Sequence, residues 1–206
     1  RSGKDALLWG LTEFNVTYKN PDREVTGYGN TSFLGGQFMA EVFGFGMQYQ
    51  AKMMNPWCIN EVDRVATDFG YLGMPSEFHP RSTYYHMQMM SEHMLDEFLP
   101  SKNNQDYVKT IATSSKKRIA LLIMNQDQNK DFDFVVNFSS GINKGAKAEV
   151  SPPLVIELEG KSSKKFLGKI PAQSSALYVF NKKGKLKKHI SYGVKENLKH
   201  LPPLVN

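Results

Sequence analysis

The pattern of apolar positions changes near residue 105 of the 206-residue chain. Residues 6–14 (ALLWGLTEF) form a mostly apolar run of strand length, as expected for a parallel strand that is covered on both faces. From Ser32 onward, apolar residues recur at spacings of three and four, which predicts a helix, capped by Asn30 or Thr31. The apolar residues on one face of this helix are Leu34, Phe38, Val42, Phe45 and Tyr49.

A second unit of strand and helix follows. Residues 51–59 (AKMMNPWCI) are short and apolar, with a proline that is tolerated only near a strand end. After a long loop, apolar residues at helical spacing predict a second helix that ends near residues 99–104. These residues are Met87, Met90, Met94 and Phe98.

Beyond residue 105 the apolar period becomes two, which is typical of an antiparallel β-sandwich. The last residues, 196–206, are expected to form a strap over it. Two lysine-rich stretches, residues 161–169 and 182–189, are interpreted as solvated turns. The strand-like runs are residues 107–114, 118–125, 132–138, 153–160 and 175–185.

Two parallel strands do not make a buried sheet by themselves, because each needs a neighbour and helices on both faces. Residues 1–104 are therefore predicted to be the last two strand–helix units of a (β/α)8 barrel, and residues 105–206 an antiparallel β-sandwich domain. Such a barrel needs about 250 residues, so about six units would be missing. The chain starts at Arg1 without a signal peptide, and we expect it to begin mid-barrel.

Composition narrows the function classes. The net charge of +6 comes from lysines that are not interleaved with aromatics, which argues against nucleic-acid binding and leaves open a weak affinity for sulfated or acidic polymers. No apolar run is long enough to span a membrane. The single cysteine, Cys58, excludes an internal disulfide. We expect neither a metal nor a cofactor, because His86 and His93 lie seven residues apart and residues 27–36 lack a nucleotide-binding fingerprint.

Candidate chemistry lies at the predicted strand ends, where barrels carry their catalytic groups. Glu13 ends the first strand and Trp57 ends the second. A retaining glycosidase needs a nucleophilic carboxylate and a second carboxyl group as acid/base, about 5 to 5.5 Å apart. The indole of Trp57 would give a sugar ring an apolar surface on which to stack. Further polar residues suited to binding sugar hydroxyls are Asn15, Tyr28, Asn55, Glu61 and His79.

Two short motifs carry a family resemblance. WGLTEFN, residues 9–15, resembles the seventh-strand motif of clan A glycoside hydrolases, and MNPWCINE, residues 54–61, is similar to their eighth-strand region. A β-sandwich after the barrel completes the pattern of many polysaccharidases of this clan. The chain is most similar to the agarase and porphyranase family, family 86, which acts on β-linked galactans of red algae.

The resemblance implies that Glu13 is the nucleophile and Trp57 the sugar platform. The acid/base of the clan follows an asparagine at the end of the fourth strand, which this chain does not contain, and Glu61 stands in the wrong place for that role. We therefore expect a retaining glycoside hydrolase acting on a polysaccharide or oligosaccharide. Its partner would be the missing N-terminal barrel portion, without which the 206 residues are inactive.

The expected location is secreted, periplasmic or on the outer surface. An alternative function is a non-catalytic carbohydrate-binding or structural β-sandwich module. A third, nucleic-acid binding through the lysines, predicts a steep salt dependence of DNA affinity.

Overall fold

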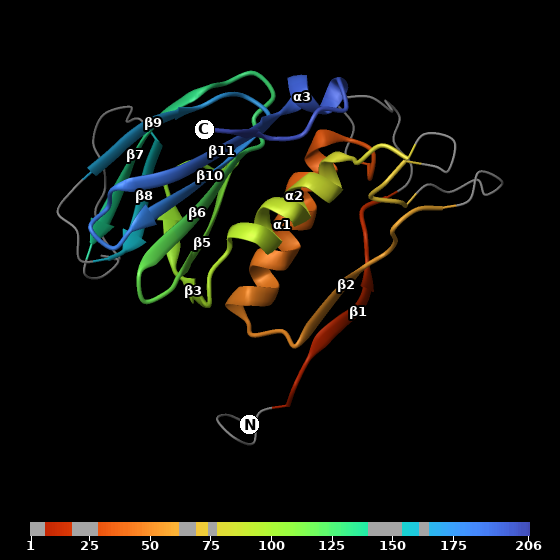
Figure 1. Cartoon of the computed structure of the whole chain (residues 1–206), viewed down its shortest axis with the longest axis horizontal. Helices are drawn as coiled ribbons and strands as arrows, with labels where there is room; N and C mark the ends of the chain where they lie inside the picture. The colour runs from red at the N-terminus through yellow and green to blue at the C-terminus, as the bar shows by residue number, and fades with distance from the viewer. Residues whose placement is uncertain (1–6, 18–28, 62–68, 74–77, 140–153, 161–164) are drawn as a thin grey trace. The chain divides into compact units, whose positions relative to one another are not determined.

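The computed structural model describes residues 7–17, 29–61, 69–73, 78–139, 154–160 and 165–206 (Figure 1). The chain divides into two compact units, Arg1–Met87 and Gln88–Asn206, and we describe each by itself. It is a mixed α/β protein that is rich in sheet and has few helices in its described part. None of the helices described is both long enough and apolar enough to cross a membrane.

The first unit has the predicted order of strand, helix, strand and helix. The elements are β1 (Gly10–Phe14), α1 (Phe33–Gln48), β2 (Met53–Pro56) and α2 (Ser82–His93), whose last residues belong to the second unit. β1 and β2 pair in parallel, with Gly10 opposite Met53. Pro56 is the last residue of β2, in agreement with the expectation that it lies near a strand end.

Helix α1 differs from its prediction in two respects. Its N-cap is Ser32, not Asn30 or Thr31, and the Ser32 hydroxyl accepts a hydrogen bond from the Gly35 amide at 3.0 Å. The predicted apolar face is largely exposed: of its five residues only Leu34 is buried, and Tyr49 is 60% exposed. The buried face consists mainly of small residues together with Phe33, Gln37 and Met39. Small side chains let a neighbouring helix approach closely, and hydrophobicity alone does not detect such a face.

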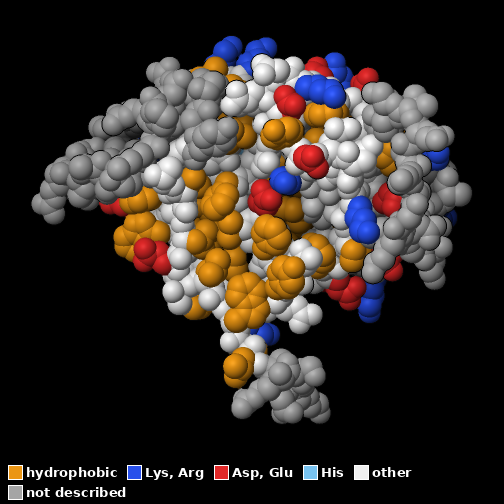
Figure 2. Space-filling model, turned by 180° about the vertical axis from the view of Figure 1, so that it is seen from behind, with side chains coloured by type: hydrophobic (Ala, Val, Ile, Leu, Met, Phe, Trp, Pro, Cys, Tyr) orange, Lys and Arg blue, Asp and Glu red, His pale blue; other side chains and the backbone are white. Residues whose placement is uncertain are grey.

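Hydrophobic side chains remain exposed on the first unit. Figure 2 shows one face of the molecule, on which hydrophobic side chains gather in a band. In β1 and the residues just before it, the exposed ones are Leu7, Leu8, Trp9 and Leu11, of which Leu7 is 77% exposed. Those of α1 and β2 are Phe38, Phe45 and Met53.

The end of helix α2 was predicted incorrectly. The helix stops at His93, and Phe98 lies in a strand, β3 (Glu97–Leu99), that pairs antiparallel with β5 (Val108–Ser114). The Leu95 amide donates a hydrogen bond to the Thr113 hydroxyl at 2.8 Å, which leads the chain into this pairing. Strand pairing thus overrides the helical spacing of the methionines.

The second unit contains a six-stranded sheet in the order β12-β11-β10-β6-β5-β3. All neighbouring strands in it are antiparallel. Besides β3 and β5, its strands are β6 (Arg118–Asn125), β10 (Ser174–Asn181), β11 (Leu186–Gly193) and β12 (Leu204–Val205). The C-terminal residues, expected to form a strap, contain a short helix, α3 (Val194–Leu198), and the edge strand β12.

A four-stranded sheet has the order β4-β8-β7-β9. Strands β7 and β8 run parallel, with Phe134 opposite Leu154, so the expectation of an entirely antiparallel second unit is wrong at this pair. An alternating apolar pattern is the same for both directions of pairing and does not distinguish them. The strands are β4 (Ser101–Asn103), β7 (Phe132–Ser139), β8 (Leu154–Glu159) and β9 (Lys165–Ile170).

Both lysine-rich stretches contain strands, which corrects their interpretation as turns. Strand β9 covers much of the first stretch and β11 covers half of the second. In β11 the apolar residues Ile190 and Tyr192 are buried, although lysines dominate the start of the strand. The adjacent Lys187, which is exposed, and Lys188, which is half-buried, conceal this strand when charge alone is considered.

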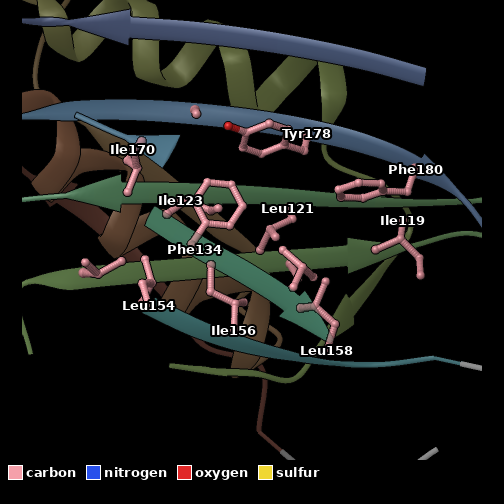
Figure 3. Packing of buried hydrophobic residues seen from close by; sticks show 14 of the residues in the cluster. Ile119, Leu121, Ile123, Phe134, Leu154, Ile156, Leu158, Ile170, Tyr178 and Phe180 are labelled. Carbon is pink, nitrogen blue, oxygen red and sulfur yellow. The ribbon is translucent and has the colours of Figure 1, made fainter. Parts of the chain in front are cut away.

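The two sheets contribute alternate side chains to one hydrophobic core (Figure 3). Phe134 of β7 meets Tyr178 of β10 edge to face at 5.7 Å between ring centroids, and Phe138 meets Phe180 in the same way at 5.4 Å. Core residues of the six-stranded sheet include Ile119, Leu121, Ile123, Tyr178 and Phe180. Those of the four-stranded sheet include Phe134, Val136, Phe138, Ile156 and Leu158.

Candidate active site

The carboxyl ends of β1 and β2 lie side by side because the two strands are parallel and paired. The pairing continues one step beyond β2: the Trp57 amide donates a hydrogen bond to the Phe14 carbonyl at 2.8 Å. Glu13 is the penultimate residue of β1 and its side chain is exposed. The structure therefore brings Glu13 and Trp57, the two principal candidates, to adjacent strand ends.

Glu13 occupies an irregular part of β1. Leu11 pairs with Met54 and Phe14 pairs with Pro56, so the two residues Thr12 and Glu13 stand opposite the single residue Asn55. A β-bulge has this two-to-one relation, and bulges redirect a side chain and are frequent beside active sites. Because of this register shift, regular strand alternation does not predict the direction of the Glu13 side chain.

The Trp57 side chain is held at its nitrogen. Its indole Nε1 donates a hydrogen bond to Glu61 Oε1 at 3.3 Å, and the Cys58 thiol lies 3.5 Å from the same oxygen. The side chain remains 48% exposed. An indole that is fixed at its polar edge and open to solvent elsewhere is suited to stacking against an apolar ring surface. The peptide bond between Trp57 and Cys58 is cis.

Asn15 joins the strand ends to the following loop. Its Nδ2 donates hydrogen bonds to the Trp57 carbonyl and, at 2.7 Å, to the Phe69 carbonyl. Its Oδ1 accepts a hydrogen bond from the Val16 amide at 2.6 Å. The amide of Asn15 thus positions the backbone on which Trp57 stands.

The loop after β2 is organised around one carbonyl group. Gly70 O accepts hydrogen bonds from Asn30 Nδ2, just before α1, and from Arg81 Nη1, just before α2, both at 2.8 Å. A Cβ atom at Gly70 would lie 2.5 Å from the Leu72 carbonyl oxygen, so this position requires glycine. No sequence pattern indicates a role for Gly70 or Arg81, because that role depends on contacts between distant segments.

The remaining predicted residues are placed as follows. Asn55 is exposed, and its Nδ2 lies 4.0 Å from the Met53 sulfur. His79 lies three residues before α2, and its carbonyl accepts a hydrogen bond from the Gly73 amide at 2.8 Å. Tyr28 lies outside the described residues. The structure therefore groups Glu13, Asn15, Asn55, Trp57 and Glu61, with His79 on the adjoining loop.

Burial perturbs one tyrosine near the strand ends. The pKa of Tyr71 is raised, first by burial and then by the nearby Cys58 thiol. The Tyr71 amide also donates to the Cys58 carbonyl at 3.0 Å, which fixes the loop against the residue after Trp57. Among the described residues, no group of three or more His, Cys, Asp or Glu side chains is placed to hold a metal ion.

Helices α1 and α2 make a close contact that supports this region. Ser82 Oγ donates a hydrogen bond to the Phe33 carbonyl at 2.9 Å, and His86 Nδ1 donates to the Ser82 carbonyl at 2.8 Å. The Phe33 ring meets the His86 ring edge on, with 5.4 Å between centroids. His86 is completely buried, and burial lowers its pKa to about 4. His86 is therefore a neutral packing residue at neutral pH.

Comparisons with known proteins support a fold relationship. No family model and no curated protein sequence matches the chain. A GH51 α-L-arabinofuranosidase from Thermotoga petrophila RKU-1 matches over 83% of this chain and 42% of its own, with 11% identity and a TM-score of 0.55. An α-L-arabinofuranosidase from Thermotoga maritima, solved with arabinose, covers 82% and 42%, with 11% identity and a TM-score of 0.54.

A GH30 endoxylanase from Clostridium papyrosolvens C71 also matches, over 84% of this chain and 41% of its own, with 13% identity and a TM-score of 0.50. The chain thus spans about two fifths of the length of these solved structures. At such low identity the likeness concerns the fold alone. In fold, the chain is similar to part of each of these glycoside hydrolases.

Proposed function

We propose that the chain is the C-terminal portion of a retaining glycoside hydrolase of clan A. In this proposal β1, α1, β2 and α2 are the last two units of a (β/α)8 barrel, and β3 to β12 form a β-sandwich. The fold likeness and the parallel pairing of β1 with β2 support it. The exposed apolar residues of β1 support it too, because barrel strands are covered on both faces.

One observation carries the proposal: Glu13 lies on a bulge at the carboxyl end of β1, directly beside the strand end that presents Trp57. Carboxyl ends of barrel strands are where catalytic groups converge. A carboxylate beside an anchored, half-exposed indole offers both a nucleophile and a surface for the sugar ring.

The reaction follows from these two groups. The Glu13 carboxylate attacks the anomeric carbon and forms a glycosyl-enzyme ester, while an acid supplied by another part of the barrel protonates the departing glycosidic oxygen. Water then attacks the anomeric carbon, the same group accepts its proton, and Glu13 is released. The carboxylate of Glu61 accepts the indole hydrogen bond and supports the platform.

The substrate is a polysaccharide or oligosaccharide, and a β-linked algal galactan such as agarose or porphyran is our first candidate. Trp57 would stack on the sugar that is cleaved, and Asn55, Tyr28 and His79 would bind its hydroxyl groups. Asn15 would act by positioning Trp57. We also propose that the enzyme works outside the cytoplasm, as a secreted, periplasmic or outer-surface protein, where polymeric substrates are met.

The proposal requires the rest of the barrel for activity, since this chain supplies one of the two carboxyl groups needed. The experiment therefore uses the complete polypeptide that contains this chain. Glu13→Gln removes the nucleophile with little change of shape, and Glu92→Gln, on exposed α2 surface, makes the same change away from the strand ends. Agarose, porphyran, xylan and arabinoxylan serve as substrates, the last two because of the structural neighbours.

We expect Glu13→Gln to lower kcat at least a thousandfold on the substrate that is cleaved, with polysaccharide binding retained, and Glu92→Gln to leave turnover unchanged. Binding is read by affinity electrophoresis of the complete polypeptide in gels that contain the polysaccharide. With Glu13→Ala, azide should restore turnover and yield a glycosyl azide. Unchanged turnover in Glu13→Gln would contradict the proposal and favour the non-catalytic carbohydrate-binding module.

A further inference from the structure

One end of the six-stranded sheet is rich in positive charge. The turn between β5 and β6, residues 115–117, and the turn between β10 and β11, residues 182–185, lie at this end. They are neighbours because Asn181 of β10 pairs with Arg118 of β6 (Figure 1, lower left). We name this surface the basic end, defined by Lys116, Lys117, Arg118, Lys182, Lys183 and Lys185, all of which are exposed.

Negative charge at this end is smaller. The described carboxylates there belong to Asp96 and Glu97 beside Ser114 at the far edge, and to Glu159 at the end of β8. The basic end thus has six cations and three described carboxylates. Two of these carboxylates lie at the far edge of the sheet: Glu97 is in the edge strand β3, and Asp96 directly precedes it. The described residues of this end therefore carry a net positive charge.

Both turns are fixed by a polar side chain of their own. Asn181 Oδ1 accepts hydrogen bonds from the Lys183 and Lys185 amides, each at 3.0 Å, and Gly184 has the positive φ of 72° that this turn needs. In the other turn the Ser115 hydroxyl accepts from the Arg118 amide at 3.2 Å. A ligand that binds here does not have to order the backbone, which reduces the entropic cost of binding.

The cations are close enough for their fields to add. Neighbouring strands are about 4.8 Å apart, so the three spacings from β5 to β11 span about 14 Å. The Debye length is about 8 Å at physiological ionic strength, so cations on adjacent strands, such as β6 and β10, lie within reach of one another. An extended polyanion would meet several of these charges at once.

We propose that the basic end binds an anionic polysaccharide, one that carries sulfate ester or carboxylate groups. This rests on the proposed function, because a glycoside hydrolase gains from holding its polymer at a second surface. Single-stranded nucleic acids are bound through aromatic side chains interleaved with cations. Among the described residues the basic end exposes no large aromatic side chain. The exposed aromatic side chain described in the second unit, that of Tyr107, lies beside Gln126 at the opposite end of the sheet.

The test uses the 206-residue chain and three polymers: κ-carrageenan as a sulfated galactan, polygalacturonate as a carboxylated polymer, and agarose as a neutral galactan. Two variants lose the same charge. Lys182→Gln/Lys185→Gln changes the basic end, and Lys195→Gln/Lys199→Gln changes exposed lysines of α3 and the residue after it, at the other end of β11.

We expect the first variant to bind its polyanion about fivefold more weakly at low salt and the second to bind less than twofold more weakly. Affinity should fall as NaCl is raised, and agarose should bind far more weakly than the polyanion. Binding of carrageenan alone would assign sulfate, and binding of polygalacturonate alone would assign carboxylate.

Three results would overturn the inference: equal losses in the two variants, equal affinity for agarose, or a duplex or single-stranded DNA that binds more tightly through the same lysines. Because binding is measured on the chain without turnover, these results are independent of Glu13. A failure of the glycosidase proposal, seen as unchanged kcat in Glu13→Gln, would leave this measurement intact.

Discussion

Trp57 and Glu61 form a side-chain pair across one turn of the loop that follows β2, with the indole Nε1 of Trp57 donating to Glu61 Oε1 at 3.3 Å. The pair explains how a tryptophan at a strand end keeps one orientation while it is half exposed. It also separates two roles that a carboxylate near a strand end can have. Glu61 accepts a hydrogen bond from an indole, whereas Glu13 makes no hydrogen bond of this kind in the described part of the structure.

Replacing Glu61 should therefore affect substrate binding more than chemistry. In the complete polypeptide, Glu61→Ala removes the acceptor of the indole and should raise KM about fivefold with kcat nearly unchanged, since a hydrogen bond of this type contributes about 1 kcal/mol. Glu61→Gln keeps an acceptor oxygen and should have a smaller effect. Steady-state kinetics measure both. A large fall in kcat in both variants would instead make Glu61 a catalytic residue.

Asn15 should be important for stability. In Asn15→Ala the carbonyl groups of Trp57 and Phe69 each lose the hydrogen bond from Asn15 Nδ2, and we expect the free energy of unfolding to fall by about 1–3 kcal/mol. Asn55→Ala is the matched control, because this exposed amide has only a distant sulfur contact, and a change below about 0.5 kcal/mol is expected. Urea denaturation of the chain provides the measurement. Similar losses in the two variants would refute the positioning role.

Gly36 should be the least replaceable glycine of α1. A Cβ atom at this position would lie 2.2 Å from Ser82 Oγ and 2.5 Å from the Ser82 backbone carbon, so α2 would have to move. Gly36→Ala is expected to destabilise the chain by about 2 kcal/mol or more, although alanine has a higher helix propensity than glycine. At Gly46, on the same helix, a Cβ meets only the flexible side chain of Met54. Gly46→Ala should be near neutral in a thermal melt.

His86 should make the chain less stable in mild acid. Its pKa is about 4 in the folded chain against about 6.5 when unfolded, so between these values the unfolded chain binds more protons. The free energy of unfolding should therefore be complete above pH 6.5 and fall as pH is lowered towards 4. The difference of about 2.5 pKa units corresponds to about 3 kcal/mol.

Urea denaturation at pH 7.5 and pH 4.5 measures this effect. His86→Asn keeps a donor for the Ser82 carbonyl and cannot titrate, so its stability should depend less on pH than that of the wild type. His93 and His189 also have pKa values lowered by burial, and they set the slope that remains. An equal pH slope in wild type and variant would rule out His86 as the source.

Much of this architecture follows from hydrophobic periodicity. The order of strands and helices up to α2 is the order predicted from the sequence. The strands β5, β6, β7, β8 and β10 coincide with predicted strand-like runs. The adjacency of Glu13 and Trp57 was predictable as well, because parallel strands align their carboxyl ends. What the sequence conceals depends on contacts between distant segments. Examples are the bulge at Thr12 and Glu13, the parallel pairing of β7 with β8, and the carbonyl of Gly70.

The lysine-rich strands are a further example. β9 and β11 were hidden because lysines dominate their local composition, although they bury apolar residues such as Ile170 of β9 and Ile190 and Tyr192 of β11. The buried face of α1 was hidden for a different reason. Its small residues, such as Gly36 and Ala40, allow close packing but add little hydrophobicity to the sequence pattern. Neither local charge nor hydrophobicity alone therefore detects every buried face.

The two edge strands of the six-stranded sheet are very short: β12 has two residues and β3 has three. An edge strand displays unpaired backbone groups along its length, and a long, flat edge can recruit strands from other molecules. Here the longer strands β11 and β5 are each partly covered by a short neighbour, and Glu97 places a charge on one of the edges. The sheet therefore offers little backbone for self-association, which should help the chain to remain monomeric at the high local concentrations reached on a polymer surface.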